Sequence, residues 1–267
     1  MRWLYSLFIV LIALLVLGPP FEGSASGYGA EMITAHRGSS HAAPENTLSA
    51  LKRAIADGAG VAEIDVRMTA DGVIVLSHDD SLLRAAGADV RISQSAYEDL
   101  KRYDVGGRFG AAYAGERIPT LTEALRLAAG KILLNIDIKT DVPSPGLPAA
   151  VAETIVREDA VGRVVVTSFD ERAVSDVKRI EPRLLAGVII NMPSQLNDAL
   201  FNRGDIDILS VRGTLVNRHL VQKAHAHGKK IYAWTINRPA DMARMARYGV
   251  DSIITDQPDV LYRLLFP

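Results

Sequence analysis

The chain has 267 residues, of which 48% are hydrophobic and 23% are charged, and its formal net charge is −1. This composition is typical of a globular protein with a sizeable core, arranged as one large domain or two small ones. The near-neutral charge gives no indication of a polyanion-binding surface. The chain contains no cysteine, which excludes disulfide bonds, thiolate metal sites and a lipid-modified N-terminal cysteine.

The N-terminus carries a hydrophobic segment. Arg2 precedes an apolar run from Trp3 to Leu17, which is roughly as long as a signal sequence and slightly short of the ~20 residues that comfortably span a bilayer. The pattern fits a cleaved signal peptide and an uncleaved anchor about equally well. Arg2 favours an N-terminus that stays inside, so we expect an extracytoplasmic protein, either secreted or periplasmic, or membrane-anchored. Residues 1–29 are then signal or anchor plus linker, and residues 30–267 form the folded domain.

Beyond the linker, short apolar runs rich in β-forming residues alternate with segments of helical periodicity. The predicted strands are Met32–His36, Val61–Arg67, Val73–His78, Lys131–Lys139, Arg163–Ser168, Leu185–Ile190, Asp207–Val211, Lys230–Thr235 and Ser252–Thr255. The predicted helices are Thr47–Asp57, Leu121–Ala129, Leu147–Glu158, Glu171–Ile180, Arg218–His227, Pro239–Tyr248 and Pro258–Leu265, with a weaker one at Ser194–Asn202. Such alternation predicts a parallel sheet covered by helices.

Nine predicted strands are one too many for a (β/α)8 barrel. Between the second and the third there is no room for a crossover helix, and Asp71-Gly72 is a hairpin turn signal. We therefore expect the third strand to fold back antiparallel onto the second. The remaining eight predict an irregular TIM-type (β/α)8 barrel with an extra β-hairpin arm. Residues 80–120 have few periodic features, and we expect them to form a small insertion over the barrel mouth.

Polar residues gather where a TIM barrel carries its functional side chains, at the carboxyl ends of the strands. His36 and Arg37 end the first predicted strand. Glu63 and Asp65 lie two positions apart on the second strand, so their side chains share one face. The hairpin returns His78 to the level of these acids. We expect the five residues to meet at one rim of the barrel.

The next barrel strand, LLNIDIK, places Asn135, Asp137 and Lys139 on one face. Three carboxylates in one mouth repel one another unless they take up protons, pair with bases or hold a cation between them. Oxygen ligands favour a hard ion such as Mg2+ or Ca2+. The competing interpretation is a salt-bridge network of the acids with Arg37, Arg67 and Lys139.

Two histidines, His36 and His78, are expected beside the acidic cluster. Such a pair suggests acid/base chemistry because imidazole titrates near neutral pH, although each could instead be a structural histidine with satisfied hydrogen bonds. Arg37 and Lys139 add positive charge, which fits a phosphate group bound by a metal and two bases together. Simple charge balance for the carboxylates is the alternative role of these two bases.

Together these residues resemble the glycerophosphodiester phosphodiesterase family. The resemblance runs in order from about Ile33 to Pro258, through AHRGSSHAAPENTLSALKRAIADGA, AEIDVRMTADGVIVLSHDDSLLR, IPTLTEAL, LLNIDIK, TSFD, AWTIN and ITDQP. It implies a TIM-type barrel with a small insertion after the HD motif. It also implies that a small-molecule glycerophosphodiester is hydrolysed to glycerol 3-phosphate and an alcohol with the help of one divalent cation, Mg2+ or Ca2+.

The same resemblance implies roles for single residues. Glu63, Asp65 and Asp137 correspond to the metal ligands of the family. His36 and His78 correspond to its acid/base pair, and the order of the two stays open. The third acid of the family is commonly Glu, whereas Asp137 is one methylene shorter. This difference leaves the metal preference and the detailed coordination open.

Further residues are implied as substrate contacts. Arg37 and Lys139 correspond to phosphate contacts. Glu45 and Asn46 of the PENT segment lie near the family's site, although Asn46 or the threonine after it could merely cap the following helix. Trp234 corresponds to an aromatic that lines the substrate, with a place in the barrel core as the alternative.

Other functions stay open at this point. A related barrel could act as a lysophospholipase D or a phosphoinositide-type phosphodiesterase at a membrane, next to the apolar residues 3–17. A non-catalytic, exported phosphodiester-binding protein and a structural barrel with salt-bridged acids are further alternatives. No nucleic-acid partner is expected, and the sequence fixes neither the preferred head group nor the oligomeric state.

Overall fold

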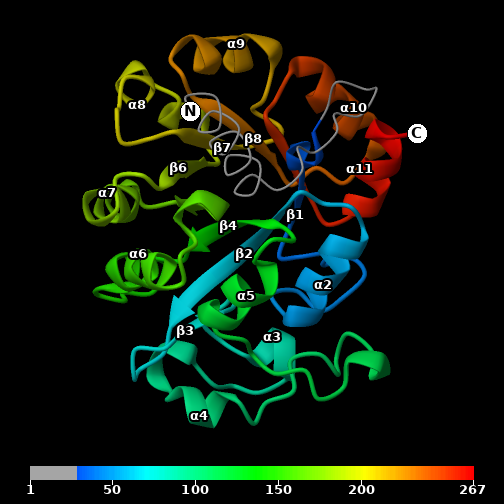
Figure 1. The fold of residues 1–267 in the computed structure, drawn as a ribbon, viewed down its shortest axis with the longest axis vertical. Helices are drawn as coiled ribbons and strands as arrows, with labels where there is room; N and C mark the ends of the chain where they lie inside the picture. Colours follow the sequence, from blue (N-terminus) through cyan, green and yellow to red (C-terminus); the bar gives the residue numbers. More distant parts are fainter. Residues whose placement is uncertain (1–28) are drawn as a thin grey trace, which may run out of the picture.

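The computed structural model describes residues 29–267, which form a closed barrel of parallel strands surrounded by helices (Figure 1). The eight barrel strands are β1 (Ile33–Ala35), β2 (Val61–Met68), β4 (Leu133–Ile138), β5 (Val164–Ser168), β6 (Leu185–Ile190), β7 (Ile208–Arg212), β8 (Lys230–Trp234) and β9 (Ser252–Thr255). The strand β1 closes the barrel because it pairs in parallel with both β2 and β9. The predicted TIM-type (β/α)8 barrel is confirmed.

An additional strand, β3 (Ile74–Leu76), pairs antiparallel with the end of β2. Gly72 in the connecting turn has a φ of +84°, a left-handed conformation that glycine adopts readily because it has no Cβ. The hairpin expected at Asp71-Gly72 is confirmed. The strand is shorter than predicted, so His78 lies in the loop after it and its side chain is not fixed by the sheet pleat.

Helices occupy the connections between strands and cover the outside of the barrel (Figure 1). They are α2 (Leu48–Ala56), α5 (Leu121–Ala128), α6 (Leu147–Arg157), α7 (Glu171–Ile180), α8 (Asp198–Phe201), α9 (Arg218–Ala226), α10 (Pro239–Tyr248) and α11 (Pro258–Leu265). Helix α5 begins with a capping box, in which Thr120 Oγ1 accepts from the Glu123 backbone N–H at 3.2 Å and Glu123 Oε2 accepts from the Thr120 backbone N–H at 2.7 Å. The amphipathic face of α7 buries Ala173, Val174 and Val177.

Alternation along β2 and β4 separates an apolar outer face from a polar inner face. Ile64 and Ile136 belong to the main hydrophobic core, which includes buried residues of the surrounding helices. Glu63, Asp65 and Asp137 instead line a cavity inside the barrel. The parallel register places Asp65 directly beside Asp137. Strand pairing therefore brings the three predicted acids onto one patch of the inner wall.

Residues 80–120 form a small unit beside the barrel, below β3 in Figure 1. The unit contains α3 (Leu83–Ala86), α4 (Tyr97–Leu100) and two 3₁₀ turns, η2 (Ile92–Gln94) and η3 (Ala111–Tyr113). Its buried residues Leu82, Ile92, Leu100 and Ile118 form a hydrophobic cluster together with Val75 of β3. The Tyr113 hydroxyl donates to the Ala42 carbonyl at 2.7 Å, so the unit also contacts the loop that follows β1.

The predicted hydrophobic segment Trp3–Leu17 lies outside the described residues. Among residues 29–267, no helix combines the length and the apolar character that crossing a membrane requires.

Candidate active site

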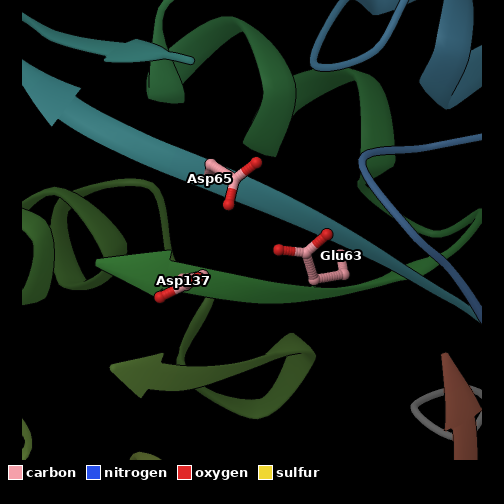
Figure 2. A group of neighbouring side chains, drawn as sticks. All are labelled: Glu63, Asp65 and Asp137. Atoms are coloured by element: carbon pink, nitrogen blue, oxygen red, sulfur yellow. The ribbon is translucent and has the colours of Figure 1, made fainter. Parts of the chain in front are cut away.

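Three buried carboxylates on β2 and β4 form an acidic cluster (Figure 2), in which one oxygen of each lies within 4.8 Å of the others. Burial and the charge of Asp65 raise the pKa of Glu63 to about 8. Burial, opposed by Lys139, raises the pKa of Asp137 to about 6. For Asp65 burial also acts upward, but the charges of Lys139 and Arg37 outweigh it and lower the pKa to about 2. The cluster therefore lacks enough positive charge to ionise all three acids at neutral pH.

Lys139 bridges two of these acids, because Nζ lies 2.7 Å from Oδ1 of Asp65 and 2.5 Å from Oδ2 of Asp137. The other oxygen, Oδ1 of Asp137, is buried and finds no hydrogen-bond partner within residues 29–267. A buried carboxylate oxygen without a donor is costly unless a proton or a cation reaches it. Three convergent carboxylates with one such oxygen fit a hard divalent cation.

The salt-bridge interpretation of the acids holds only in part. Lys139 pairs with two acids, and Nε of Arg37 lies 3.4 Å from Oδ2 of Asp65. Arg67, expected in the same network, instead donates to the His78 carbonyl at 2.5 Å and pairs with Asp141 at 2.7 Å. For Arg67 the interpretation is wrong, because at the end of β2 its long side chain reaches the loops rather than the acids.

The turn after β1 contains two residues in the left-handed region, Arg37 at a φ of +55° and Asn46 at +57°. Such conformations cost non-glycine residues of order 1–3 kcal/mol each. The side-chain amide of Asn46 makes two hydrogen bonds to Asp65. Its Nδ2 donates to Oδ2 of Asp65 at 2.7 Å, and its Oδ1 accepts from the backbone N–H of Asp65 at 3.0 Å. Thr47, which accepts from the Ala50 N–H at 3.1 Å, is the cap of α2.

Each predicted histidine has an aspartate at Nδ1. The distance is 2.6 Å between His36 Nδ1 and Asp256 Oδ1, and 2.7 Å between His78 Nδ1 and Asp79 Oδ1. We assign the hydrogen to Nδ1 in both rings, which leaves Nε2 free for proton transfer. Burial acts to lower the pKa of His36, but the hydrogen bond to Asp256 and the charge of Glu63 outweigh it and raise the pKa. Burial lowers the pKa of His78.

One cavity of about 150 Å³ is lined by both histidines, the three acids, Arg37 and Lys139. Phe169 and Trp234 line it as well, with their rings edge to face and their centroids 6.0 Å apart. Nε1 of Trp234 donates to the Ser210 carbonyl at 2.8 Å, which fixes the indole plane. The cavity therefore joins a charged part to an aromatic part.

The predicted residues Glu45 and Asn46 do not line this cavity. Glu45 accepts from Arg37 at 3.0 Å and Asn46 donates to Asp65 at 2.7 Å. Both residues therefore contact groups that do line the cavity. A larger cavity of about 340 Å³ lies between β3, α5 and α6, with Glu153 and Arg157 as its charged lining residues. It contains none of the predicted site residues.

Asp256 directly follows β9, at a strand end where the sequence already indicates a polar residue of the rim. Three other residues near the site had no predicted role: Asp79, Arg84 and Phe169. Asp79 directly follows His78 and Phe169 directly follows β5, so the rule that chemistry lies at the carboxyl ends of the strands could have found both. Arg84 had no such signal, because only the tertiary fold brings its helix α3 to the site.

Known proteins resemble this chain along most of its length. Residues 36–260 match the model of the Glycerophosphoryl diester phosphodiesterase family. A glycerophosphodiester phosphodiesterase of Caldanaerobacter subterraneus subsp. tengcongensis is 35% identical over 238 residues, which cover 88% of this chain and 97% of the relative. The structure of an Oleispira antarctica phosphodiesterase in complex with the product sn-glycerol-3-phosphate is 30% identical, with a TM-score of 0.80 over 88% of this chain and 96% of that one. This chain therefore belongs to the glycerophosphoryl diester phosphodiesterase family.

Proposed function

We propose that the protein hydrolyses glycerophosphodiesters to glycerol 3-phosphate and an alcohol, with a divalent cation and two histidines. One observation carries the proposal. Within residues 29–267, Nε of Arg37 and Oδ1 of Asp137 are buried without a hydrogen-bond partner, and both residues line the same cavity. A cavity whose lining residues include an unpartnered donor and an unpartnered acceptor is an arrangement that a metal-bound anion would complete.

Glu63, Asp65 and Asp137 would hold the cation, either Mg2+ or Ca2+. A cation bound there would polarise a phosphate oxygen and stabilise the negative charge of the transition state. Asn46 keeps Asp65 oriented through its two hydrogen bonds. Lys139 limits the repulsion between Asp65 and Asp137, so the cluster keeps its geometry before the substrate arrives.

Arg37 and Lys139 bind the phosphate group in this proposal. Nε of Arg37 lies 3.4 Å from Oδ2 of Asp65 but makes no hydrogen bond within residues 29–267, so its N–H can turn to the phosphate. Lys139 Nζ keeps one of its three N–H groups after pairing with two acids. As the new bond to phosphorus forms, these donors stabilise the charge that builds on the phosphate oxygens. Phe169 and Trp234 provide an apolar wall for the carbon atoms of the glycerol or the alcohol.

His36 and His78 transfer the protons. One ring accepts a proton at Nε2 from the glycerol 2-hydroxyl or from a water molecule, whose oxygen then bonds to phosphorus. If the 2-hydroxyl is the nucleophile, the first product is a cyclic phosphate, and a water molecule then bonds to phosphorus while the bond to the 2-oxygen breaks, which gives glycerol 3-phosphate. The other ring donates a proton from Nε2 to the oxygen of the alcohol while its bond to phosphorus breaks, so the alcohol leaves neutral. Each transfer contributes about 10²- to 10⁴-fold to the rate.

We further propose that residues 30–267 form a single catalytic domain outside the cytoplasm. The apolar run Trp3–Leu17 behind Arg2 supports export. Mass spectrometry of the native N-terminus distinguishes a cleaved signal peptide from a retained anchor. An intact N-terminus in the cytosolic fraction would contradict both forms of export.

Comparison of two substrates tests the proposed activity. Glycerol 3-phosphate release from glycerophosphocholine is measured next to cleavage of lysophosphatidylcholine, in the presence of Mg2+ or Ca2+. We expect glycerophosphocholine to be the better substrate. Preference for lysophosphatidylcholine would favour a lysophospholipase D, and tight binding of glycerophosphocholine without turnover would favour a binding protein; either result would contradict the proposal.

A further inference from the structure

Arg84 connects the insertion to the candidate active site. It lies on the short helix α3 (Leu83–Ala86), beside the barrel (Figure 1), and its side chain is half exposed. Its Nε donates to Oδ2 of Asp79 at 2.7 Å. Its two terminal nitrogens donate to Oε2 and Oε1 of Glu45 at 2.6 and 2.8 Å. One guanidinium therefore binds two carboxylates at once.

Each of these carboxylates holds a residue that lines the cavity. The other oxygen of Asp79 pairs with His78 Nδ1 at 2.7 Å. Glu45 Oε1 also accepts from Arg37 at 3.0 Å. His78 follows β3 and Arg37 follows β1, so the two groups belong to different parts of the barrel mouth. Arg84 therefore connects two arms of a network: the His78 arm, which runs through Asp79, and the Arg37 arm, which runs through Glu45.

We propose that Arg84 is a positioning residue that fixes the His78 ring and the Arg37 guanidinium relative to each other by binding Asp79 and Glu45 together. This inference rests on the proposed function. It assigns the insertion a task in the reaction, since the side chain comes from α3. Arg84 does not line the cavity, so it acts through the two carboxylates.

The geometry separates this network from an ordinary surface ion pair. An isolated exposed pair adds little, whereas bidentate arginine–carboxylate pairs within a network are the exception. The planar fork of arginine holds two carboxylates in defined directions, which lysine cannot do with a single point charge. A displacement of the acid/base group by about 1 Å can cost a factor of about 10² in rate, so a residue outside the cavity can control turnover.

The kinetic constants of three neutral variants test the two arms. Asp79→Asn is expected to lower kcat with little change in KM, because it loosens only the His78 arm. Glu45→Gln is expected to act mainly on KM, because it loosens Arg37 at the phosphate. Arg84→Gln is expected to change both, with kcat/KM reduced about 10- to 100-fold, a loss of the size that follows removal of the outer hydrogen-bond partners of metal ligands. A change in KM alone or in kcat alone for Arg84→Gln would contradict a shared role.

A mutant cycle distinguishes positioning from direct contact. In a protein that already carries Asp79→Asn and Glu45→Gln, Arg84→Gln should cost less than about 3-fold, since the residues it acts through are disabled. If Arg84→Gln lowers kcat/KM equally in the parent and in the protein with both other substitutions, Arg84 binds the substrate directly, and the inference is overturned. Arg84→Lys should recover the activity only in part; full recovery would mean that charge alone suffices, which also overturns it.

Arg91→Gln is the matched control. Arg91 also belongs to the insertion, has a similar exposure of 53% against 50%, and lies 3.6 Å from a carboxylate oxygen of Asp80. Its kcat/KM should stay within about 3-fold of the parent's, and thermal unfolding shows whether each variant folds. An inactive parent would overturn the proposed function and the inference with it. An active parent with an Arg84→Gln variant that matches the control would overturn the inference alone.

Discussion

The shortest hydrogen bond made by a site histidine joins His36 Nδ1 to Asp256 Oδ1 at 2.6 Å. Asp256 is itself held in place, since it accepts from the Ser40 hydroxyl at 3.0 Å and from the Asn237 amide at 2.5 Å. Burial acts to raise the pKa of Asp256, but the hydrogen bond from His36 outweighs it and lowers the pKa to about 2. The carboxylate therefore stays charged at every physiological pH and fixes the tautomer of His36.

Asp256→Asn is expected to lower kcat by about 10²- to 10⁴-fold, because an amide can donate to Nδ1 and select the wrong tautomer. Loss of the carboxylate also lowers the pKa of His36, so the limb of the pH–rate profile that His36 controls moves to lower pH. Asp79→Asn should move the other limb, which His78 controls. The two profiles together identify the acid and the base. Unchanged kcat and unchanged limbs in Asp256→Asn would contradict the positioning of His36.

The histidines themselves are tested by His36→Ala and His78→Ala. Each removes one proton transfer, so each should reduce turnover by about 10²- to 10⁴-fold while the circular dichroism spectrum stays that of the parent. His225→Ala is a suitable control, because His225 pairs with Asp251 at 2.9 Å at the end of α9 and does not line the cavity. Turnover near the parent's level in either site variant would remove that histidine from the mechanism.

The stability of the metal-free protein should depend on pH through the acidic cluster. The pKa of Glu63 rises from 4.5 to about 8 and that of Asp137 from 3.8 to about 6. At a pH between the ordinary pKa of either acid and its raised pKa, the folded protein binds more protons than the unfolded chain. The free energy of unfolding therefore falls as the pH rises from the ordinary value to the raised one. Asp65, with a pKa lowered to about 2, acts in the opposite direction only at far lower pH.

A cation competes with protons for the same carboxylates, so its stabilising effect should grow with pH. The melting temperature is measured at pH 5 and pH 8, with EDTA and with Mg2+ or Ca2+. We expect the gain from the cation to be larger at pH 8. Equal gains at both pH values, or no gain at either, would favour a cluster held by Lys139 and Arg37 without a metal.

Asp137 can be changed in two informative ways. Asp137→Asn removes one ligand charge and should abolish both the thermal gain from the cation and most of the activity. Asp137→Glu keeps the charge on a longer side chain, so activity should persist while the preference between Mg2+ and Ca2+ changes. Asp176→Asn, on the exposed face of α7, serves as the control. An Asp137→Asn variant with the parent's metal response would exclude Asp137 as a ligand.

The acidic cluster was predictable because it depends on regular geometry. The period of two along a strand puts Glu63 and Asp65 on one face, and parallel pairing puts Asp137 beside them. The β2–β3 hairpin followed from Asp71-Gly72 in the same way. These features need only local rules and the barrel topology, which strand–helix alternation indicates.

Other features depend on contacts that local rules do not contain. The double hydrogen bond of Asn46 to Asp65 requires a left-handed residue in a turn, and the propensity of asparagine for helix caps suggested a different role. Arg67 has the same strand parity as the acids, yet it reaches Asp141 instead. Arg84 comes from a helix of four residues, which is too short to leave a periodic signal. The prediction for the N-terminal segment stays a prediction.

The central claim is that the carboxylates of Glu63, Asp65 and Asp137 hold a divalent cation that the two histidines need for turnover. Release of glycerol 3-phosphate from glycerophosphocholine tests it most directly, measured on the purified protein as isolated, after EDTA treatment, and after Mg2+ or Ca2+ is added back. We predict that EDTA abolishes the release and that one of the two ions restores it. Full activity in EDTA would contradict the claim.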